Sequence, residues 1–265
     1  MHSNITDYVA ELKHRRRALL KSYDDENLHQ LRVNIRRLRG LLKQRPDKAS
    51  RKLRRELGKL VKRTNRARDW DTLAGYAARV LTPGQLTVLR PVIAAQQAEP
   101  HRKALRMLQT RRWSSALKQL KKYRDSGEPG AVVLRSHTGE SAKALKREKQ
   151  ARRQALARGD DDDWHALRIA IKDLRYTLES RALSGKGPKA EVQATIHQCK
   201  QLQDALGDWH DAVVHQSLLK ELAASAQALE DPEVMAVVEL LAGTLSARSR
   251  DCLKPVREIL DRAAE

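Results

Sequence analysis

The chain has 265 residues, of which 40% are hydrophobic and 32% are charged, so it can bury a core but has no stretch apolar enough to cross a membrane. Its formal net charge is +20, which points to an anionic partner such as nucleic acid, an anionic surface or a free polyphosphate. The two cysteines, Cys199 and Cys252, lack metal-type spacing and indicate reduced thiols in the cytosol rather than disulfides or a zinc site.

Helix-forming residues dominate and strand-like alternation is nearly absent, which predicts an all-α protein. Acidic clusters at Asp24–Glu26 and Asp160–Asp163 are typical of helix starts. The expected helices cover residues 3–22, 24–44, 48–80 (one helix or a broken pair), 85–123 (interrupted near Pro91 and Pro100), 132–158, 161–183, 189–227 and 233–263 (with a kink at Pro255).

Two halves, 1–124 and 131–265, are predicted on either side of a linker at residues 125–130, and a further turn is predicted at 185–188. Residues 1–130 hold 32 Lys and Arg against 12 Asp and Glu, whereas residues 131–265 hold 21 of each. Four helical segments in each half predict two four-helix bundles related by pseudo-two-fold symmetry. The first half carries the whole positive excess.

A sequence motif occurs once in each half, first at residues 28–39 and again at 164–175, with a constant offset of 136. Both copies fit the frame His-x-Leu-Arg-x-x-Ile-Lys/Arg-x-Leu-Arg. An internal repeat of this kind predicts that the two halves are built on equivalent helices.

On a helix at about 100° per residue, the basic residues of each copy fall on one edge, beside the apolar face. We call these edges the cationic stripes, and their members are His29, Arg32, Arg36, Arg39 and Lys43 in the first copy and His165, Arg168, Lys172 and Arg175 in the second. The predicted core-facing residues are Leu28, Leu31, Ile35, Leu38, Leu42, Trp164, Leu167, Ile171, Leu174 and Leu178. Like charges at i,i+4 repel by a few tenths of a kcal/mol per pair, a cost that a bound polyanion would reverse.

A weaker cationic row is predicted in residues 48–80, at spacings that place Arg55, Lys59, Lys62 and Arg66 on one face. The row precedes the element Arg68-Asp69-Trp70-Asp71. The corresponding part of the second half contains Leu206-Gly207-Asp208-Trp209-His210-Asp211.

These motifs closely resemble those of the CHAD family, the conserved histidine α-helical domain. The first motif is followed by the Arg-Asp-x-Asp element at 68–71, and the second by the Leu-Gly-x-x-x-Asp element at 206–211. The resemblance covers nearly the whole chain, which looks like a stand-alone member. Two positions depart from the first copy: Asp173 stands opposite Arg37, and Glu179 stands opposite Lys43 and should weaken the far end of the second stripe.

The resemblance implies two four-helix bundles around a basic central cavity that binds inorganic polyphosphate, in the cytoplasm or at polyphosphate or polyhydroxyalkanoate granules. We expect the cationic stripes to face that cavity and to contact phosphate, with Lys59, Lys62 and Arg66 as weaker contributors. Arginine suits this task because its planar fork matches phosphate oxygens. We expect no cofactor, no metal, no membrane insertion and no catalysis.

Several alternatives stay open. His29 and His165 are candidates for metal chelation, but neither has a second ligand at suitable spacing, and each is expected to donate to phosphate or to pack against its counterpart. A metal-dependent phosphohydrolase would use Asp69, Asp71, Asp208 or Asp211 with a divalent metal. The simpler interpretation of Asp69 and Asp211 is that they hold helix ends or pair with Arg68 and neighbouring arginines. A nucleic-acid or granule-surface scaffold is the third possibility, disfavoured for single strands because aromatic residues make up only 3% of the chain.

Overall fold

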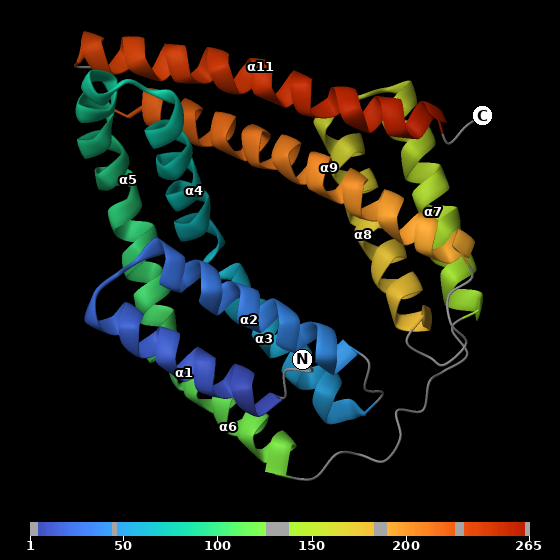
Figure 1. Ribbon diagram of the computed structural model, residues 1–265. Coiled ribbons are helices and arrows are strands. Elements are labelled where there is room, and N and C mark those ends of the chain that lie inside the picture. The colour runs from blue at the N-terminus through green and yellow to red at the C-terminus, as the bar shows by residue number, and fades with distance from the viewer. Residues whose placement is uncertain (1–4, 44–46, 126–137, 183–189, 226–230, 263–265) are drawn as a thin grey trace. The chain divides into compact units, whose positions relative to one another are not determined.

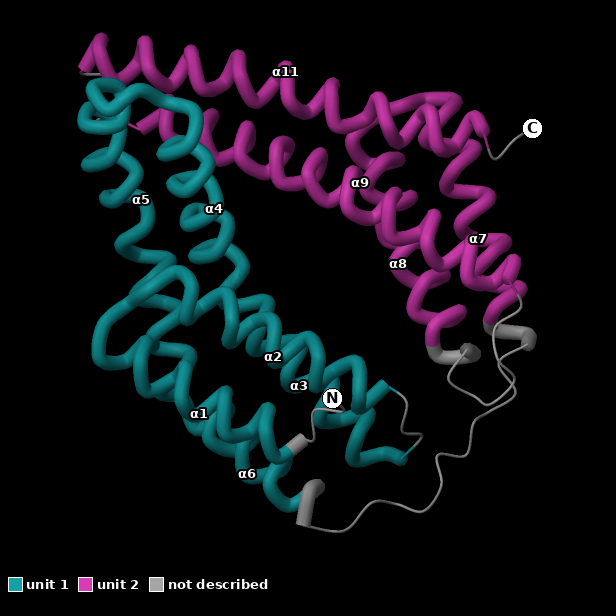
Figure 2. Tube along the Cα trace, viewed as in Figure 1, with its two compact units in different colours: residues 1–133 teal, residues 134–265 magenta. Residues whose placement is uncertain are grey.

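The computed structural model describes residues 5–43, 47–125, 138–182, 190–225 and 231–262 (Figure 1). These residues form helices and no strands, which confirms the all-α prediction. The chain forms two compact units, Met1–Val133 and Leu134–Glu265 (Figure 2). The domain limits at 124 and 131, the pseudo-two-fold relation and the central cavity stay predictions. Within the described ranges, no helix is long and apolar enough to cross a membrane.

Unit 1 contains α1 (Ile5–Lys21), α2 (Asp25–Lys43), α3 (Lys48–Lys62), α4 (Asn65–Val80), α5 (Pro83–Gln109) and α6 (Arg111–Asp125). Helices α1, α2, α3 and α6 pack around one apolar core, while α4 and α5 pair with each other. In α2 the predicted core face is confirmed, because all five residues predicted to form it are buried: Leu28, Leu31, Ile35, Leu38 and Leu42.

Unit 2 contains α7 (Thr138–Ala157), α8 (Asp161–Ala182), α9 (Ala190–Ala223) and α11 (Pro232–Arg262). Helix α8 packs between α7 and α9, and α9 pairs along its length with α11. The predicted core face of α8 is also confirmed, since Trp164, Leu167, Ile171, Leu174 and Leu178 are all buried. In chain order, α9 stands where unit 1 has α3 and α4, and α11 stands where unit 1 has α5 and α6.

The two motif helices begin in the same way. The Asp24 carboxylate accepts a hydrogen bond from the Asn27 backbone N–H at 2.7 Å, and the Asp160 carboxylate accepts one from the Asp163 N–H at 2.9 Å. Each acid therefore satisfies a backbone donor that the first helical turn leaves free. This confirms the predicted helix starts.

The prolines do not divide the chain as predicted. Helix α5 runs continuously through Pro91 and Pro100, and the break falls at Thr110, which begins α6 by accepting the Trp113 N–H at 3.2 Å. A proline removes only one backbone donor, and α5 remains anchored beyond Pro100 by buried Ala104, Met107 and Leu108. Helix α11 runs through Pro255 as the single helix that the sequence predicted, and the kink expected at Pro255 stays a prediction. The predicted linker, from residue 126 onward, and the turn at 185–188 lie outside the described residues.

Candidate anion-binding helices

Helix α2 carries the first cationic stripe on the edge beside its buried face. Arg36 and Lys43 are exposed, whereas His29, Arg32 and Arg39 are half-buried. The neighbouring Arg37 is also exposed but lies one residue, or about 100°, around the helix from Arg36. The stripe therefore mixes exposed charges with partly desolvated ones.

Arg32 has a structural task as well as its charge. Its Nη1 donates to the Val61 carbonyl at 3.2 Å, to the Thr64 hydroxyl at 2.7 Å and to the Asn65 side-chain carbonyl at 3.0 Å. Burial, followed by repulsion from Arg36, lowers the pKa of Arg32 to about 10. Arg32 therefore ties α2 to the turn between α3 and α4.

The turn between α3 and α4 divides the weaker cationic row that the sequence predicted. Thr64 ends α3 by donating both its backbone N–H and its hydroxyl to the Val61 carbonyl, at 2.9 Å and 2.8 Å. Lys59 and Lys62 therefore lie on α3, whereas Arg66 lies on α4 with its guanidinium 5.4 Å from the centre of the Trp70 ring. The residues predicted to form one continuous row belong to two helices.

Lys59 is also engaged within the protein. Its Nζ lies 2.9 Å from the Glu56 carboxylate, which accepts a second bond from Arg112 of α6 at 2.7 Å. These two hydrogen bonds, that of Lys59 first, lower the pKa of Glu56. Lys59 is thus less available to an external anion than exposed Lys62.

Arg39 presents a buried donor without an acceptor. Its guanidinium lies against Gly58 of α3, where an added Cβ would come within 3.2 Å of Cζ. Burial and the nearby charge of Arg54 lower its pKa. Among the described residues, no acceptor bonds its buried Nε. A buried unpaired donor is unfavourable, so this position suits an anion that supplies oxygen atoms.

His29 lies among arginines. Burial lowers its pKa, and the charges of Arg68, Arg36 and Arg32 lower it further. Arg68 of α4 also lies 3.9 Å from the Asp25 carboxylate. His29 is therefore a neutral imidazole at pH 7, able to donate one N–H but not to add a positive charge.

Asp71 is an anchor whose partners the sequence did not identify. Its buried carboxylate accepts from Tyr23 at 2.6 Å and Gln97 at 3.3 Å and lies 2.7 Å from Nε2 of His101. The rings of Tyr23 and His101 stack with centroids 3.7 Å apart. Burial, then the bond to Asp71, raises the pKa of Tyr23. Asp71 therefore joins the α1–α2 turn to α4 and α5.

Helix α8 repeats the arrangement of α2 with more carboxylates. Within the described part of the chain, the buried Nε atoms of Arg168 and Arg175 lack acceptors, as does that of Arg39 in α2. Arg175 also lies 3.4 Å from Glu179 and 4.6 Å from the centre of the Tyr176 ring. The contact with Glu179 reduces the positive charge available at this end of α8, as its position opposite Lys43 suggested.

Other members of the α8 stripe also have neighbours. Lys172 lies 6.0 Å from the centre of the Tyr176 ring. Asp173 forms an ion pair with Arg147 of α7 at 3.1 Å. Asp173 is therefore directed toward α7.

His165 meets a residue that sequence reasoning did not single out. Its ring centroid lies 5.1 Å from that of His210 on α9, at an interplanar angle of 41°. Burial, Arg168 and His165 together lower the pKa of His210 to about 4. The sequence signal that could have pointed to His210 is its position directly after Trp209, in the element that follows the second motif.

The carboxylates proposed for a hydrolase do not gather into a centre in the described residues. Asp71 is buried under three protein partners, whereas Asp208 and Asp211 are exposed and Asp208 lies 3.4 Å from Arg248. No group of three or more His, Cys, Asp or Glu side chains in the described ranges is placed to hold a metal ion. The free thiols Cys199 and Cys252 lie on α9 and α11.

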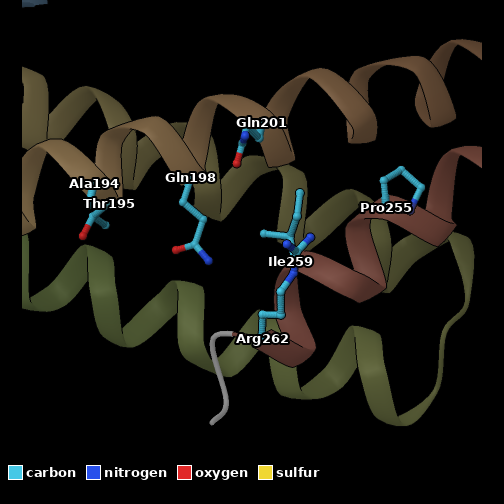
Figure 3. Close-up of a pocket in the computed structure, with 7 residues that line it drawn as sticks. All are labelled: Ala194, Thr195, Gln198, Gln201, Pro255, Ile259 and Arg262. Carbon is cyan, nitrogen blue, oxygen red and sulfur yellow. The ribbon is translucent and has the colours of Figure 1, made fainter.

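A shallow pocket of about 470 Å³ lies between α9 and α11 (Figure 3). Its lining residues are Ala194, Thr195, Gln198, Gln201, Pro255, Ile259 and Arg262. None of the stripe residues lines this pocket. It is therefore separate from the candidate anion-binding helices.

Fold and motif together define an all-helical protein built on a duplicated amphipathic helix with a cationic edge. A sequence model of the CHAD domain family matches residues 4–220, so the chain belongs to that family. Its structure is similar to the crystal structure of the CHAD domain from the plant Ricinus communis, with a TM-score of 0.69 and 22% identity, covering 97% of this chain and 89% of that one. It is also similar to PptA from Streptomyces chartreusis, with a TM-score of 0.62 and 17% identity, covering 97% and 95%. No curated protein sequence matches significantly.

Proposed function

We propose that this protein binds inorganic polyphosphate along the cationic stripes of α2 and α8. The observation that carries the proposal is that both copies of the motif, on α2 and α8, place basic residues on the edge beside a buried apolar face. Phosphate oxygens are strong, charge-assisted acceptors for guanidinium groups. Family membership supports the same assignment.

A polymer without bases fits these helices better than a nucleic acid. Binders of single strands usually stack bases on exposed aromatic rings, whereas Trp70, Trp113, Trp164 and Trp209 are all buried here. Residues separated by seven positions on a helix lie roughly 10 Å apart along its axis. Each stripe therefore offers a row of cationic groups to a chain of closely spaced phosphates.

The members of the site differ in their expected contributions. Arg36, Arg39, Arg168, Lys172 and Arg175 carry the main charge, and Arg32 contributes while also holding the α3–α4 turn. His29 and His165 donate hydrogen bonds to phosphate oxygens. Lys43, Lys62 and Arg66 add to the field, and Lys59 adds least because of Glu56.

Binding without hydrolysis is part of the proposal. Asp71, the most buried of the candidate carboxylates, already interacts with Tyr23, Gln97 and His101. Its oxygens are therefore committed to holding helices together. Incubation with polyphosphate and Mg²⁺ or Mn²⁺, followed by an assay for released phosphate, tests this directly, and sustained release would support the hydrolase alternative.

The central experiment compares two double variants of α2 by the affinity for long-chain polyphosphate. Arg36→Ala with Arg39→Ala removes two stripe cations, and Arg36→Ala with Arg37→Ala removes the same charge but only one stripe residue. We expect the first variant to lose at least about tenfold more affinity than the second, with an unchanged helical circular-dichroism spectrum. Equal losses would show that net charge alone governs binding.

Two further measurements separate the alternatives. Wild-type affinity should fall steeply with salt, because binding releases counterions. Duplex DNA should compete weakly with labelled polyphosphate at moderate salt. Efficient competition would instead favour a general scaffold for nucleic acids, and binding to isolated polyphosphate or polyhydroxyalkanoate granules would test the granule association.

A further inference from the structure

The paired imidazoles of unit 2 lie beside a partly buried arginine. His165 and Arg168 come from α8, and His210 comes from α9, with its ring 5.1 Å from that of His165. Arg168 is close enough to depress the pKa of His210, and its buried Nε lacks an acceptor among the described residues. Three nitrogen-bearing groups of two packed helices therefore gather without a carboxylate among them.

Unit 1 also has a polar residue directly after a buried tryptophan. In both units a buried tryptophan is followed by a polar residue: Asp71 after Trp70, and His210 after Trp209. Asp71 is a buried acceptor for donors from other helices, whereas His210 is only half-buried and lies next to another histidine. After these tryptophans, unit 2 thus has a titratable base and unit 1 has a buried acid.

The charged groups that act on His210, Arg168 and His165, come from α8. On α11, Arg248 is paired with Asp208 of α9 at 3.4 Å. Asp211 adjoins His210 on α9 itself and is exposed. Arg168 and His165 are the groups that act on the His210 ring.

We propose that His210, His165 and Arg168 form a phosphate subsite whose affinity for polyphosphate increases as the pH falls. The proposal rests on the polyphosphate-binding function above and adds a new contact residue and a mode of regulation. Burial, and after it the charge of Arg168, keeps His210 neutral. A phosphate group bound to Arg168 offsets the second of these causes, so the bound anion favours the imidazolium. The imidazolium in turn donates through both ring nitrogens instead of one.

The linkage between proton uptake and polyphosphate binding sets the direction in which affinity changes with pH. The pKa of His210 is about 4 in the free protein and rises when an anion binds. Binding therefore takes up a proton, and affinity increases as pH falls through the window between the free and bound pKa values. A bound pKa of about 6 would give roughly tenfold tighter binding near pH 5 than near pH 8.

The test measures the dissociation constant of long-chain inorganic polyphosphate near pH 8 and near pH 5 at constant ionic strength. His210→Gln removes the titratable ring, and His197→Gln, an exposed histidine on the same helix, is the matched control. We expect the wild type and His197→Gln to tighten by roughly tenfold, and His210→Gln to lose most of that gain. An equal gain in all three proteins would overturn the proposal.

A second measurement uses the wild-type protein alone. The pKa of His210, followed by NMR of its ring proton, should rise by at least about one unit when tripolyphosphate is added. An unchanged pKa with bound polyphosphate would overturn the subsite but leave polyphosphate binding intact. Absence of binding at both pH values, with native circular dichroism, would overturn the proposed function and the subsite together.

Discussion

The guanidinium of Arg39 on α2 lies directly against Gly58 on α3, with an added Cβ at Gly58 only 3.2 Å from Cζ. Gly58→Ala should therefore displace Arg39 from its half-buried position. Because the contact is with the end of a flexible side chain and alanine favours the helix by about 1 kcal/mol, we expect stability to change by less than about 1 kcal/mol. Polyphosphate affinity should fall by about threefold to tenfold.

Gly75→Ala is the matched control, since Gly75 is exposed on α4 and a Cβ added there would meet no atom within 4 Å. Urea unfolding and polyphosphate titration of both variants separate the two effects. A loss of affinity in Gly75→Ala equal to that in Gly58→Ala would contradict the role given to the Arg39 contact.

Removal of the Arg32 side chain should lower the stability of the fold more than removal of the Arg36 side chain. Arg32→Ala deletes the bonds from Nη1 to Val61, Thr64 and Asn65, and we expect it to lower the free energy of unfolding by about 2 kcal/mol or more. Arg36→Ala, an exposed change on the same helix, should alter it by less than about 0.5 kcal/mol. Denaturant midpoints measured without polyphosphate test the difference, and equal midpoints would refute it.

Local features of the sequence were sufficient to predict α2 and α8. Their apolar periodicity and the acids at Asp24 and Asp160 act within a few residues, so the buried faces and helix starts could be derived without a structure. The contacts of Asp71 could not, because Tyr23 lies 48 residues away and His101 lies 30 residues away in the chain. The separation along the chain is also why the sequence did not reveal that His210 is a neighbour of His165.

The prolines show a second limit to predicting helix ends from the sequence. Pro91 and Pro100 are strong local indicators of a break, yet α5 continues through both and ends at Thr110. Tertiary packing of Ala104, Met107 and Leu108 outweighs the local preference. The division of the weaker cationic row at Thr64 likewise depends on Arg32, which is 32 residues distant.

Glu179 should lower the polyphosphate affinity of the second stripe through its contact with Arg175 at 3.4 Å. Glu179→Gln removes the competing carboxylate, and we expect polyphosphate affinity to rise by about twofold to fivefold. Glu191→Gln changes the same charge at an exposed position on α9 and serves as the control. The contact would have no role in binding if both variants tightened equally in a titration at fixed salt.

The hydroxyl of Tyr23 should matter for stability and not for binding. Tyr23→Phe removes a 2.6 Å hydrogen bond to the buried Asp71 carboxylate, and we expect a loss of about 1.5–3 kcal/mol in the free energy of unfolding. Tyr8→Phe, another partly buried tyrosine packed on the same core, is the comparison and should cost less. Chemical denaturation measures both, and polyphosphate affinity should be unchanged in the folded variant.

His210 also predicts how stability depends on pH when no polyanion is present. Its pKa is lowered from 6.5 to about 4, so the unfolded chain binds more protons than the folded one between these values. Stability is therefore fully present above about pH 6.5 and is lost as the pH falls toward 4. Because the ring is only half-buried, we expect a loss of about 1 kcal/mol between pH 7 and pH 5.

The variant His210→Gln should remove most of this loss, leaving a remainder from His29, whose pKa is lowered in the same direction. His197→Gln should retain the full dependence. Denaturant unfolding at a series of pH values measures it, and a loss that persists undiminished in His210→Gln would place its origin elsewhere. Added tripolyphosphate should offset the loss near pH 5 more than near pH 7, because a ligand that takes up a proton stabilises the folded state most where that proton is available.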